Sequence, residues 1–385
     1  MITVPKGFVA AGIACGIKQS GAPDLALVAT DDGKAVVAAA VFTSNLSTAA
    51  PVVVSRAHLA STAGRAAAVV LSSGNANAAT GAQGQADAER MCSLVADGLG
   101  CRAEEVLVCS TGLIGIPLPM APLESGIPAL VAARGADGEA AATAILTTDT
   151  RDKQVVVEGA GFTVAGMAKG AAMLAPNMAT MLAVLTTDAM VEIDQAQAAL
   201  VDGVRDSFNA LSVDGCTSTN DTVILLASGR GARPDIDAFS DAVAEACAQL
   251  AFLMAGDAEG ATKVARIRVV GARTDDEASR AARKVAESQL VKCSLYGQDP
   301  YWGRVVSELG SSGVVFDPDR VSVSYGGTEV CHDGIAVAHD AAAVAAHMAG
   351  RELEIVADLG VGRGSGVILT NDLTHAYIDE NMGTS

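Results

Sequence analysis

The sequence has few aromatic residues: phenylalanine, tryptophan and tyrosine make up 3% of its 385 residues, whereas hydrophobic residues make up 50%. Its core must therefore be built mainly from alanine, valine, leucine, isoleucine and methionine. The chain also lacks a basic character, because its formal net charge is −18. Nucleic acids and acidic membranes are themselves anionic, so this charge argues against both as partners.

Spacings that indicate a bound metal are also missing. The eight cysteines form no CxxC pair, and the five histidines show no HExxH pattern. We therefore expect no metal site. The apolar stretches are well short of the roughly 20 residues that cross a bilayer, and Pro5 and Lys6 interrupt the first residues, which argues against an export signal. Scattered cysteines in such a chain fit a reducing compartment, so the sequence predicts a cytoplasmic protein.

Short β-branched runs alternate with alanine-rich stretches of helical character, which is typical of a mixed α/β protein. The strands expected in the first two thirds of the chain are residues 36–42, 51–54, 67–71, 106–109, 154–157, 181–185 and 222–227. The helices expected there are residues 85–99, 121–133, 193–207, 235–255 and 275–290.

After residue 290 the pattern changes to shorter elements. We expect strands at residues 314–316, 320–325 and 353–358, with a helix at residues 341–349. The sequence therefore predicts two domains, a large domain at residues 1–275 and a smaller α/β domain at residues 276–385.

One threonine stands where a turn gives way to a strand. Pro176 and Asn177 mark the turn, and Thr180 opens a buried apolar run. A threonine hydroxyl is a weak nucleophile unless a base lies beside it. If the peptide bond before Thr180 were cut, its own α-amino group, with a pKa near ~8, would become that base. Taken alone, a threonine at a strand start is usually structural.

The run KGAAMLAPNMATMLAVLTTDA around this threonine resembles the self-cleavage segment of the ornithine acetyltransferase family, that is, the glutamate N-acetyltransferase or ArgJ family of arginine biosynthesis. Further segments resemble that family in the same order: VFTSNLSTAAP (41–51), SSGNANAATG (72–81), STGLIG (110–115), TTDT (147–150), VDGCTSTNDT (213–222), EGATK (259–263) and DPYWGR (299–304). The resemblance thus covers nearly the whole chain, which makes it more specific than any single motif.

The resemblance implies that the chain cuts itself between Ala179 and Thr180, giving fragments 1–179 and 180–385. Thr180 would then take the acetyl group from N-acetylornithine as an acyl-enzyme and pass it to glutamate. Some members of the family also acetylate glutamate from acetyl-CoA. No cofactor is implied.

Roles for other residues also follow from the resemblance. Thr111 and Gly112 match the oxyanion-hole pair, a role that suits a hydroxyl and a backbone N–H. The family's substrate-binding positions match Thr147, Lys169, Thr180, Glu259, Asn381 and Ser385. A lysine and hydroxyls suit a substrate carboxylate, and Glu259 suits the ammonium group of ornithine. The implied architecture is an αββα layered sandwich built from both fragments, which assemble as an α₂β₂ heterotetramer.

The chain departs from the family pattern at several positions. Ala171, Ala172 and Ala175 replace the usual serine, glycine and histidine of the cleavage segment. Cys216 replaces an aspartate, Tyr301 replaces an asparagine, and the tail that carries Asn381 and Ser385 is one residue shorter than usual. A self-processing amidase or aminopeptidase, in which water takes the acyl group, is therefore the alternative. A non-catalytic binding protein is disfavoured because the Thr111–Gly112 and Ala179–Thr180 pairs are intact.

Overall fold

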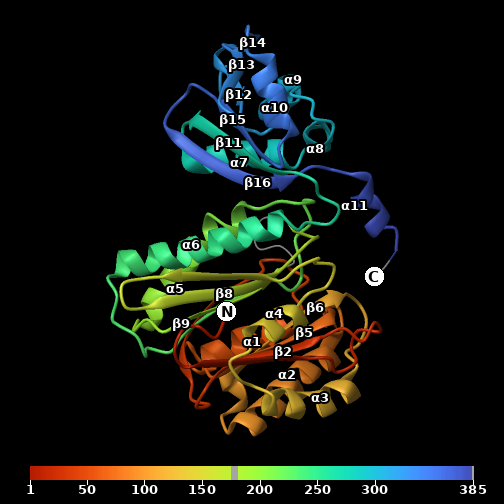
Figure 1. Cartoon of the computed structure of the whole chain (residues 1–385), viewed down its shortest axis with the longest axis vertical. Coiled ribbons are helices and arrows are strands. Elements are labelled where there is room, and N and C mark those ends of the chain that lie inside the picture. Colours follow the sequence, from red (N-terminus) through yellow and green to blue (C-terminus); the bar gives the residue numbers. More distant parts are fainter. Residues whose placement is uncertain (175–180, 384–385) are drawn as a thin grey trace. The chain divides into compact units, whose positions relative to one another are not determined.

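The computed structural model describes residues 1–174 and 181–383 (Figure 1). Three residues of the predicted site, Ala179, Thr180 and Ser385, lie outside these ranges. The chain divides into two compact units. Unit 1 comprises Met1–Asn209 and Cys216–Met254, and unit 2 comprises Ala210–Gly215 and Ala255–Ser385.

The first sheet of unit 1 has the strand order β1-β2-β5-β6. Its strands are β1 (Phe8–Ile13), β2 (Leu25–Thr30), β5 (Ala68–Asn75) and β6 (Val106–Leu113). β5 and β6 run parallel, whereas the other neighbours are antiparallel. The helices packed on this sheet are α1 (Ala50–Ser61), α2 (Gly81–Leu99) and α3 (Met120–Ala132). β2 and β5 are made almost entirely of buried residues, which is why both faces of the sheet must be covered.

The second sheet of unit 1 has the order β4-β3-β10-β9-β8-β7. Its strands are β3 (Val36–Phe42), β4 (Arg65–Ala66), β7 (Lys153–Glu158), β8 (Thr163–Lys169), β9 (Leu182–Thr187) and β10 (Thr222–Ala227). The helices of its outer layer are α5 (Ile193–Arg205) and α6 (Ile236–Ala255), and a short helix, α4 (Gly138–Ala144), contacts β1, β2 and β8. Every residue of β9 and β10 is buried, as the apolar runs in the sequence predict.

The two sheets of unit 1 pack face to face. One core cluster joins Leu71 and Leu107 of the first sheet to Val184 and Leu226 of the second. Helices lie on the outer side of each sheet, so unit 1 has the layer order α, β, β, α (Figure 1). The predicted αββα sandwich is therefore confirmed.

Unit 2 is a single mixed sheet with helices. Its strand order is β14-β13-β12-β15-β11-β16, in which only β11 and β15 run parallel. Its strands are β11 (Val264–Ala272), β12 (Ser322–Tyr325), β13 (Thr328–His332), β14 (Ile335–Ala336), β15 (Glu352–Asp358) and β16 (Gly364–Asn371). Its helices are α7 (Asp275–Ala286), α8 (Gln289–Tyr296), α9 (Trp302–Gly310), α10 (Ala341–Ala349) and α11 (His375–Glu380).

The boundary between the units lies at a different place from the predicted domain boundary. The units divide after Met254, whereas the sequence places the boundary after residue 275. The two boundaries differ because β11 belongs to unit 2: it pairs with β15 and β16 and shares their core.

Two of the predicted strands are wrong. Residues 51–54 lie in the first turns of α1, because Pro51 fixes a helical φ there and Val52 and Val54 turn their side chains into the core. Residues 314–316 form no strand. The predicted helix at 275–290 is also interrupted, since α7 ends at Ala286 and Ser288 caps a separate helix, α8.

Helix α6 is the one helix of the described residues that is long and apolar enough to cross a membrane by length and composition. The sequence predicts no apolar stretch of that length. Half of its most apolar window is buried inside the structure, which is also the property of a core helix. Phe239, Val243, Ala246 and Leu250 are fully buried, so α6 fits the role of a core helix on its sheet.

Candidate active site

The ends of several strands of unit 1 define the candidate site. In the second sheet, Lys169 of β8 pairs with Leu182 of β9, and Leu182 pairs with Thr222 of β10. This row lies at the end of β9 that follows Thr180 in the sequence. Thr111 and Gly112 lie at the carboxyl end of β6 in the first sheet. In the sequence, Met181 alone separates the predicted nucleophile from this row.

Gly112 makes a close backbone contact that no other residue could make. Its φ is +130°, and an added Cβ atom would lie 2.3 Å from the carbonyl carbon of Gly74 and 2.5 Å from the nitrogen of Asn75. Gly74 is its partner in the β5–β6 ladder. The strand ends can approach this closely only because Gly112 has no side chain.

A small cavity lies against this pair. It has a volume of about 30 Å³, and its lining includes Thr111, Gly112, Ser218, Thr219 and Asn220. That volume suits one water molecule or one carbonyl oxygen. The Asn220 side-chain amide donates to the backbone oxygens of Ala76 (2.6 Å) and Ser110 (2.9 Å), which ties the second wall of the cavity to the first sheet.

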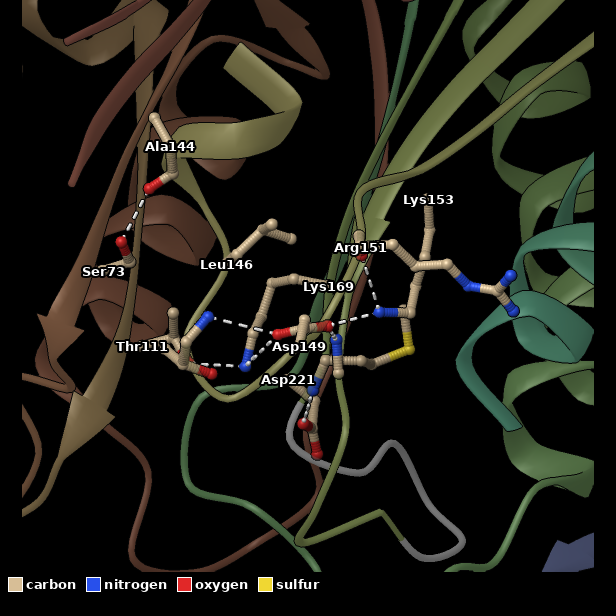
Figure 2. Close-up of polar contacts among 12 residues, drawn as sticks. Ser73, Thr111, Ala144, Leu146, Asp149, Arg151, Lys153, Lys169 and Asp221 are labelled. Carbon is tan, nitrogen blue, oxygen red and sulfur yellow. Dashed lines mark hydrogen bonds and ion pairs between the residues drawn. The ribbon is translucent and has the colours of Figure 1, made fainter. Parts of the chain in front are cut away.

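Lys169 brings a buried ammonium group to Thr111. Its side chain is buried, and its Nζ lies 3.4 Å from the Thr111 hydroxyl oxygen and 3.9 Å from Asp149 Oδ2 (Figure 2). The structure thus brings together two residues that the sequence assigns to the site. Both come from strand ends, which hold side chains more rigidly than loops do.

Asp149 is the anionic centre of this cluster. Its Oδ1 accepts from Lys153 Nζ (2.6 Å) and from the backbone N–H of Gly170 (2.7 Å). Burial alone would raise its pKa, but the ammonium groups of Lys169 and Lys153 outweigh burial and lower the pKa of Asp149 from 3.8 to about 2. Lys18 also lies within electrostatic reach of Asp149 and Lys169, and burial lowers its pKa. The site therefore gathers more positive than negative charge.

Asp149 leads to a prediction on acid stability. Its pKa is lower in the folded chain than in the unfolded chain, so its ion pairs stabilise the fold above about pH 5 and lose this effect as the pH falls through 3.8 toward 2. Asp149→Asn should lower the free energy of unfolding by about 3–5 kcal/mol at neutral pH. In urea titrations, the difference in unfolding free energy between wild type and variant should stay constant above about pH 5 and narrow as the pH falls from 5 toward 2.

Asp206→Asn is the matched control for the acid prediction, because the Asp206 side chain is 77% exposed. It should change the unfolding free energy little at any of these pH values. A gap for Asp149→Asn that stayed constant across the pH range would contradict the assignment of its lowered pKa.

Thr147 belongs to the same neighbourhood through its backbone. Its N–H donates to Asp149 Oδ2 at 3.2 Å, and the residue is partly exposed. Asp149 therefore fixes two residues that the resemblance assigns to substrate binding, Thr147 and Lys169.

Two of the predicted substrate residues lie in unit 2. Asn381 Nδ2 donates to Glu259 Oε2 at 2.7 Å, directly after α11. Gly260 allows this approach: its φ is +63°, and a Cβ atom there would lie 2.4 Å from the Tyr377 nitrogen. The short tail thus still places Asn381 beside Glu259.

Sequence reasoning missed three polar residues of the site. The sequence assigns no role to Asp149, Lys153 or Asp221. Each is buried, and burial of a charged side chain marks it as paired or functional. The sequence signal is weak, because the partners of Asp149 lie both four and about twenty residues away.

Comparison with known proteins identifies the family of this chain. A model of the ArgJ family matches residues 9–383. The arginine biosynthesis bifunctional protein ArgJ of Streptomyces coelicolor is 49% identical over 386 residues, which cover 100% of this chain and 99% of that protein. The protein of the same name from Thermobifida fusca is 47% identical, with the same coverage.

Two solved structures are also similar. An ArgJ protein from Bacillus halodurans is 33% identical with a TM-score of 0.49, and covers 51% of this chain and 95% of its own. The ornithine acetyltransferase of Mycobacterium tuberculosis, in complex with ornithine, is 47% identical with a TM-score of 0.43. The match covers 46% of this chain and 94% of that protein. The sequence matches over the whole length carry the assignment and confirm the resemblance: this chain belongs to the ArgJ family.

Proposed function

We propose that this chain is a self-processing acetyltransferase that moves the acetyl group of N-acetylornithine to glutamate. The observation that carries the proposal is the Lys169 ammonium beside the Thr111 hydroxyl, at 3.4 Å, in a chain of this family. Lys169 pairs in the sheet with Leu182, two residues after Thr180. The proposed oxyanion donor and carboxylate receiver thus lie at strand ends, and the proposed nucleophile precedes β9 by two residues in the sequence.

Self-cleavage comes first. The Thr180 hydroxyl attacks the carbonyl carbon of Ala179, the C–N bond breaks, and Ala179 becomes an ester on the Thr180 oxygen while the α-amine is released. Water then hydrolyses the ester, which leaves a carboxylate on Ala179 and restores the hydroxyl. The released α-amine has an ordinary pKa near ~8 and can accept the hydroxyl proton in later turnovers.

Acetyl transfer repeats this chemistry on the substrate. The Thr180 oxygen attacks the acetyl carbonyl of N-acetylornithine, and the C–N bond breaks as the ornithine amine leaves with a proton. The amine of glutamate attacks the acetyl ester, which gives N-acetylglutamate and restores Thr180. Thr111 and Gly112 stabilise the negative oxygen in each tetrahedral intermediate, and the 30 Å³ cavity beside them has the size for that atom.

Lys169 and Thr147 receive the substrate carboxylate in this proposal. Asp149 balances only part of the positive charge in the cluster, because Lys153 adds its charge to that of Lys169, whereas Lys18 has Asp24 as its own carboxylate partner. An incoming carboxylate would therefore be attracted rather than repelled. Both substrates carry an α-carboxylate, so one receiver serves donor and acceptor.

Glu259 receives the side-chain ammonium group of ornithine. Glu380 lies within electrostatic reach of it, and burial raises the pKa of Glu380, with Glu259 adding to that effect. Asn381, which donates to Glu259, orients the carboxylate. Ser385 completes the substrate contacts in the family pattern.

The assembly and the wider substrate range are also part of the proposal. The two fragments share one αββα core and remain together as an α₂β₂ heterotetramer in the cytoplasm. Acetyl-CoA serves as a second acetyl donor to glutamate. Native mass spectrometry of the purified protein tests the assembly, and an acetyl-CoA assay tests the donor.

The experiment that tests the reaction uses N-acetylornithine with and without glutamate. We expect N-acetylglutamate to form in an amount equal to the ornithine released, with little acetate when glutamate is absent. Acetate release that was indifferent to glutamate would instead identify the amidase. The two reactions differ only in whether an amine or water attacks the acetyl ester.

Lys169→Met should weaken substrate binding more than turnover. The methionine side chain is unbranched and only one heavy atom shorter than that of lysine, but it lacks the charge that receives the carboxylate. We expect the KM for N-acetylornithine to rise about 10- to 100-fold, the range for one hydrogen bond to a charged group. Steady-state assays of cut protein measure this change.

Lys153→Met is the matched control for Lys169. Lys153 shares the same carboxylate, at 2.6 Å, and also donates to the Arg151 backbone oxygen at 3.3 Å. Its loss should lower stability while KM stays within a few-fold of wild type. Equal effects of the two variants on KM would show that charge alone, and not contact with substrate, explains the result.

A further inference from the structure

Met181, the residue after the proposed nucleophile, is held on both sides. Its N–H donates to Asp221 Oδ1 at 2.9 Å, and its carbonyl oxygen accepts from the Thr222 N–H at 3.2 Å. The next residue, Leu182, is already paired with Thr222 in the parallel ladder. Asp221 and Thr222, two consecutive residues where β10 begins, thus both bond to the backbone of Met181, the first described residue after Thr180.

Asp221 is itself firmly placed. Its side chain is fully buried, and its backbone oxygen accepts from the Thr43 N–H at 2.9 Å. The preceding residue, Asn220, is bonded to the backbone oxygens of Ala76 and Ser110, immediately before Thr111. The loop that carries Asp221 therefore connects Met181 to the end of β6, where the proposed oxyanion donors lie.

We propose that Asp221 is a positioning residue for the nucleophile, whose carboxyl oxygen holds the Met181 N–H so that the residue before it stays in place for self-cleavage and acetyl transfer. This inference rests on the proposed function. Before cleavage Met181 is held by the chain on both sides. After cleavage only one residue precedes it, so the Asp221 bond becomes the last side-chain restraint on the new terminus among the described contacts.

The Asp221 carboxyl is well suited to this role in its neutral form. Burial raises its pKa well above the ordinary value, and the Met181 N–H and the Lys169 ammonium offset this only in part. An anionic carboxylate close to the released α-amine would favour the ammonium form, which cannot accept a proton. A neutral carboxyl restrains the chain without that effect. It offers an acceptor oxygen and an O–H donor, and an asparagine amide likewise offers an acceptor oxygen together with N–H donors.

The test compares Asp221→Asn with Asp221→Ala. Asparagine keeps an oxygen for the Met181 N–H, so self-cleavage and the kcat of cut protein should stay within about threefold of wild type. Alanine removes the acceptor, and the resulting displacement should slow both steps about 100-fold, the cost expected for a misplacement near 1 Å. Intact mass gives the cut fraction, and kcat is expressed per cut chain.

Asp188→Ala is the matched control, because Asp188 follows the opposite end of β9 and accepts the Thr163 N–H at 2.8 Å. It should lower the unfolding temperature and leave kcat unchanged. If Asp221→Ala behaved like Asp188→Ala, or if Asp221→Asn folded but lost as much activity as Asp221→Ala, the positioning role would be wrong. If Asp221→Ala failed to fold, the self-cleavage and kcat of Asp221→Asn would decide whether Asp221 has the positioning role. An uncut, inactive wild type would instead overturn the proposed function.

Discussion

Purified Thr180→Ala protein is expected to remain one chain of 385 residues and to transfer no acetyl group, whereas the wild type separates into fragments 1–179 and 180–385 under denaturing conditions. The variant lacks the oxygen that attacks in both reactions, and without cleavage it also lacks the α-amine that acts as base. Acetyl transfer should therefore fall by about three orders of magnitude or more. Intact mass and the N-acetylglutamate assay measure the two effects separately.

Thr180→Ser is the control for this prediction. Serine keeps the oxygen and, after cleavage, the amine, so the chain should still be cut at the same bond and keep measurable activity. Cleavage of Thr180→Ala at its normal position, or an uncut but active wild type, would remove Thr180 from the mechanism. Since the fragments share the core of unit 1, cleavage should leave the folded protein intact on a sizing column.

The sequence predicts the mixed α/β class and about half of the strands, because continuous apolar runs become strands buried on both faces. β3 and β10 lie at their predicted bounds, and so does α10. β8 was missed, since its run TVAGMAK contains small residues that carry little strand signal. Residues 51–54 were wrongly predicted as a strand because valines favour strands. In the structure these residues form part of α1, where Val52 and Val54 pack into the core. Tertiary contacts overrule local preference at these places.

Residues of the candidate site can be predicted from the sequence only where they lie in a segment that resembles the family. Thr111, Gly112 and Lys169 follow from family segments, and the structure places Lys169 against Thr111. Asp149 could not be found in this way, because its role depends on two lysines and two backbone N–H groups that meet only after three segments have folded. A sequence records the residues of such a cluster but not their distances.

Gly112→Ala should strongly reduce catalysis, because it adds a methyl group where the ends of two strands are in close contact. The new Cβ would lie 2.3 Å from the Gly74 carbonyl carbon and 2.5 Å from the Asn75 nitrogen, and both are backbone atoms that cannot rotate away. The ends of β5 and β6 must separate, which moves Thr111 and the Gly112 N–H away from the developing oxyanion. Because losing one such donor costs about 100- to 1000-fold in kcat, we expect a loss of that size with a smaller change in KM.

Gly100→Ala separates this effect from backbone strain. Gly100 also has a positive φ, +75°, but no atom lies within 4 Å of its added Cβ, and it caps α2 away from the β6 end. It should lower the unfolding temperature and leave kcat unchanged. Self-cleavage of Gly112→Ala should slow as well, because that reaction passes through its own oxyanion at Ala179. A Gly112→Ala enzyme that was cut at the normal rate and kept kcat within a few-fold of wild type would show that the Thr111–Gly112 pair does not bind the oxyanion.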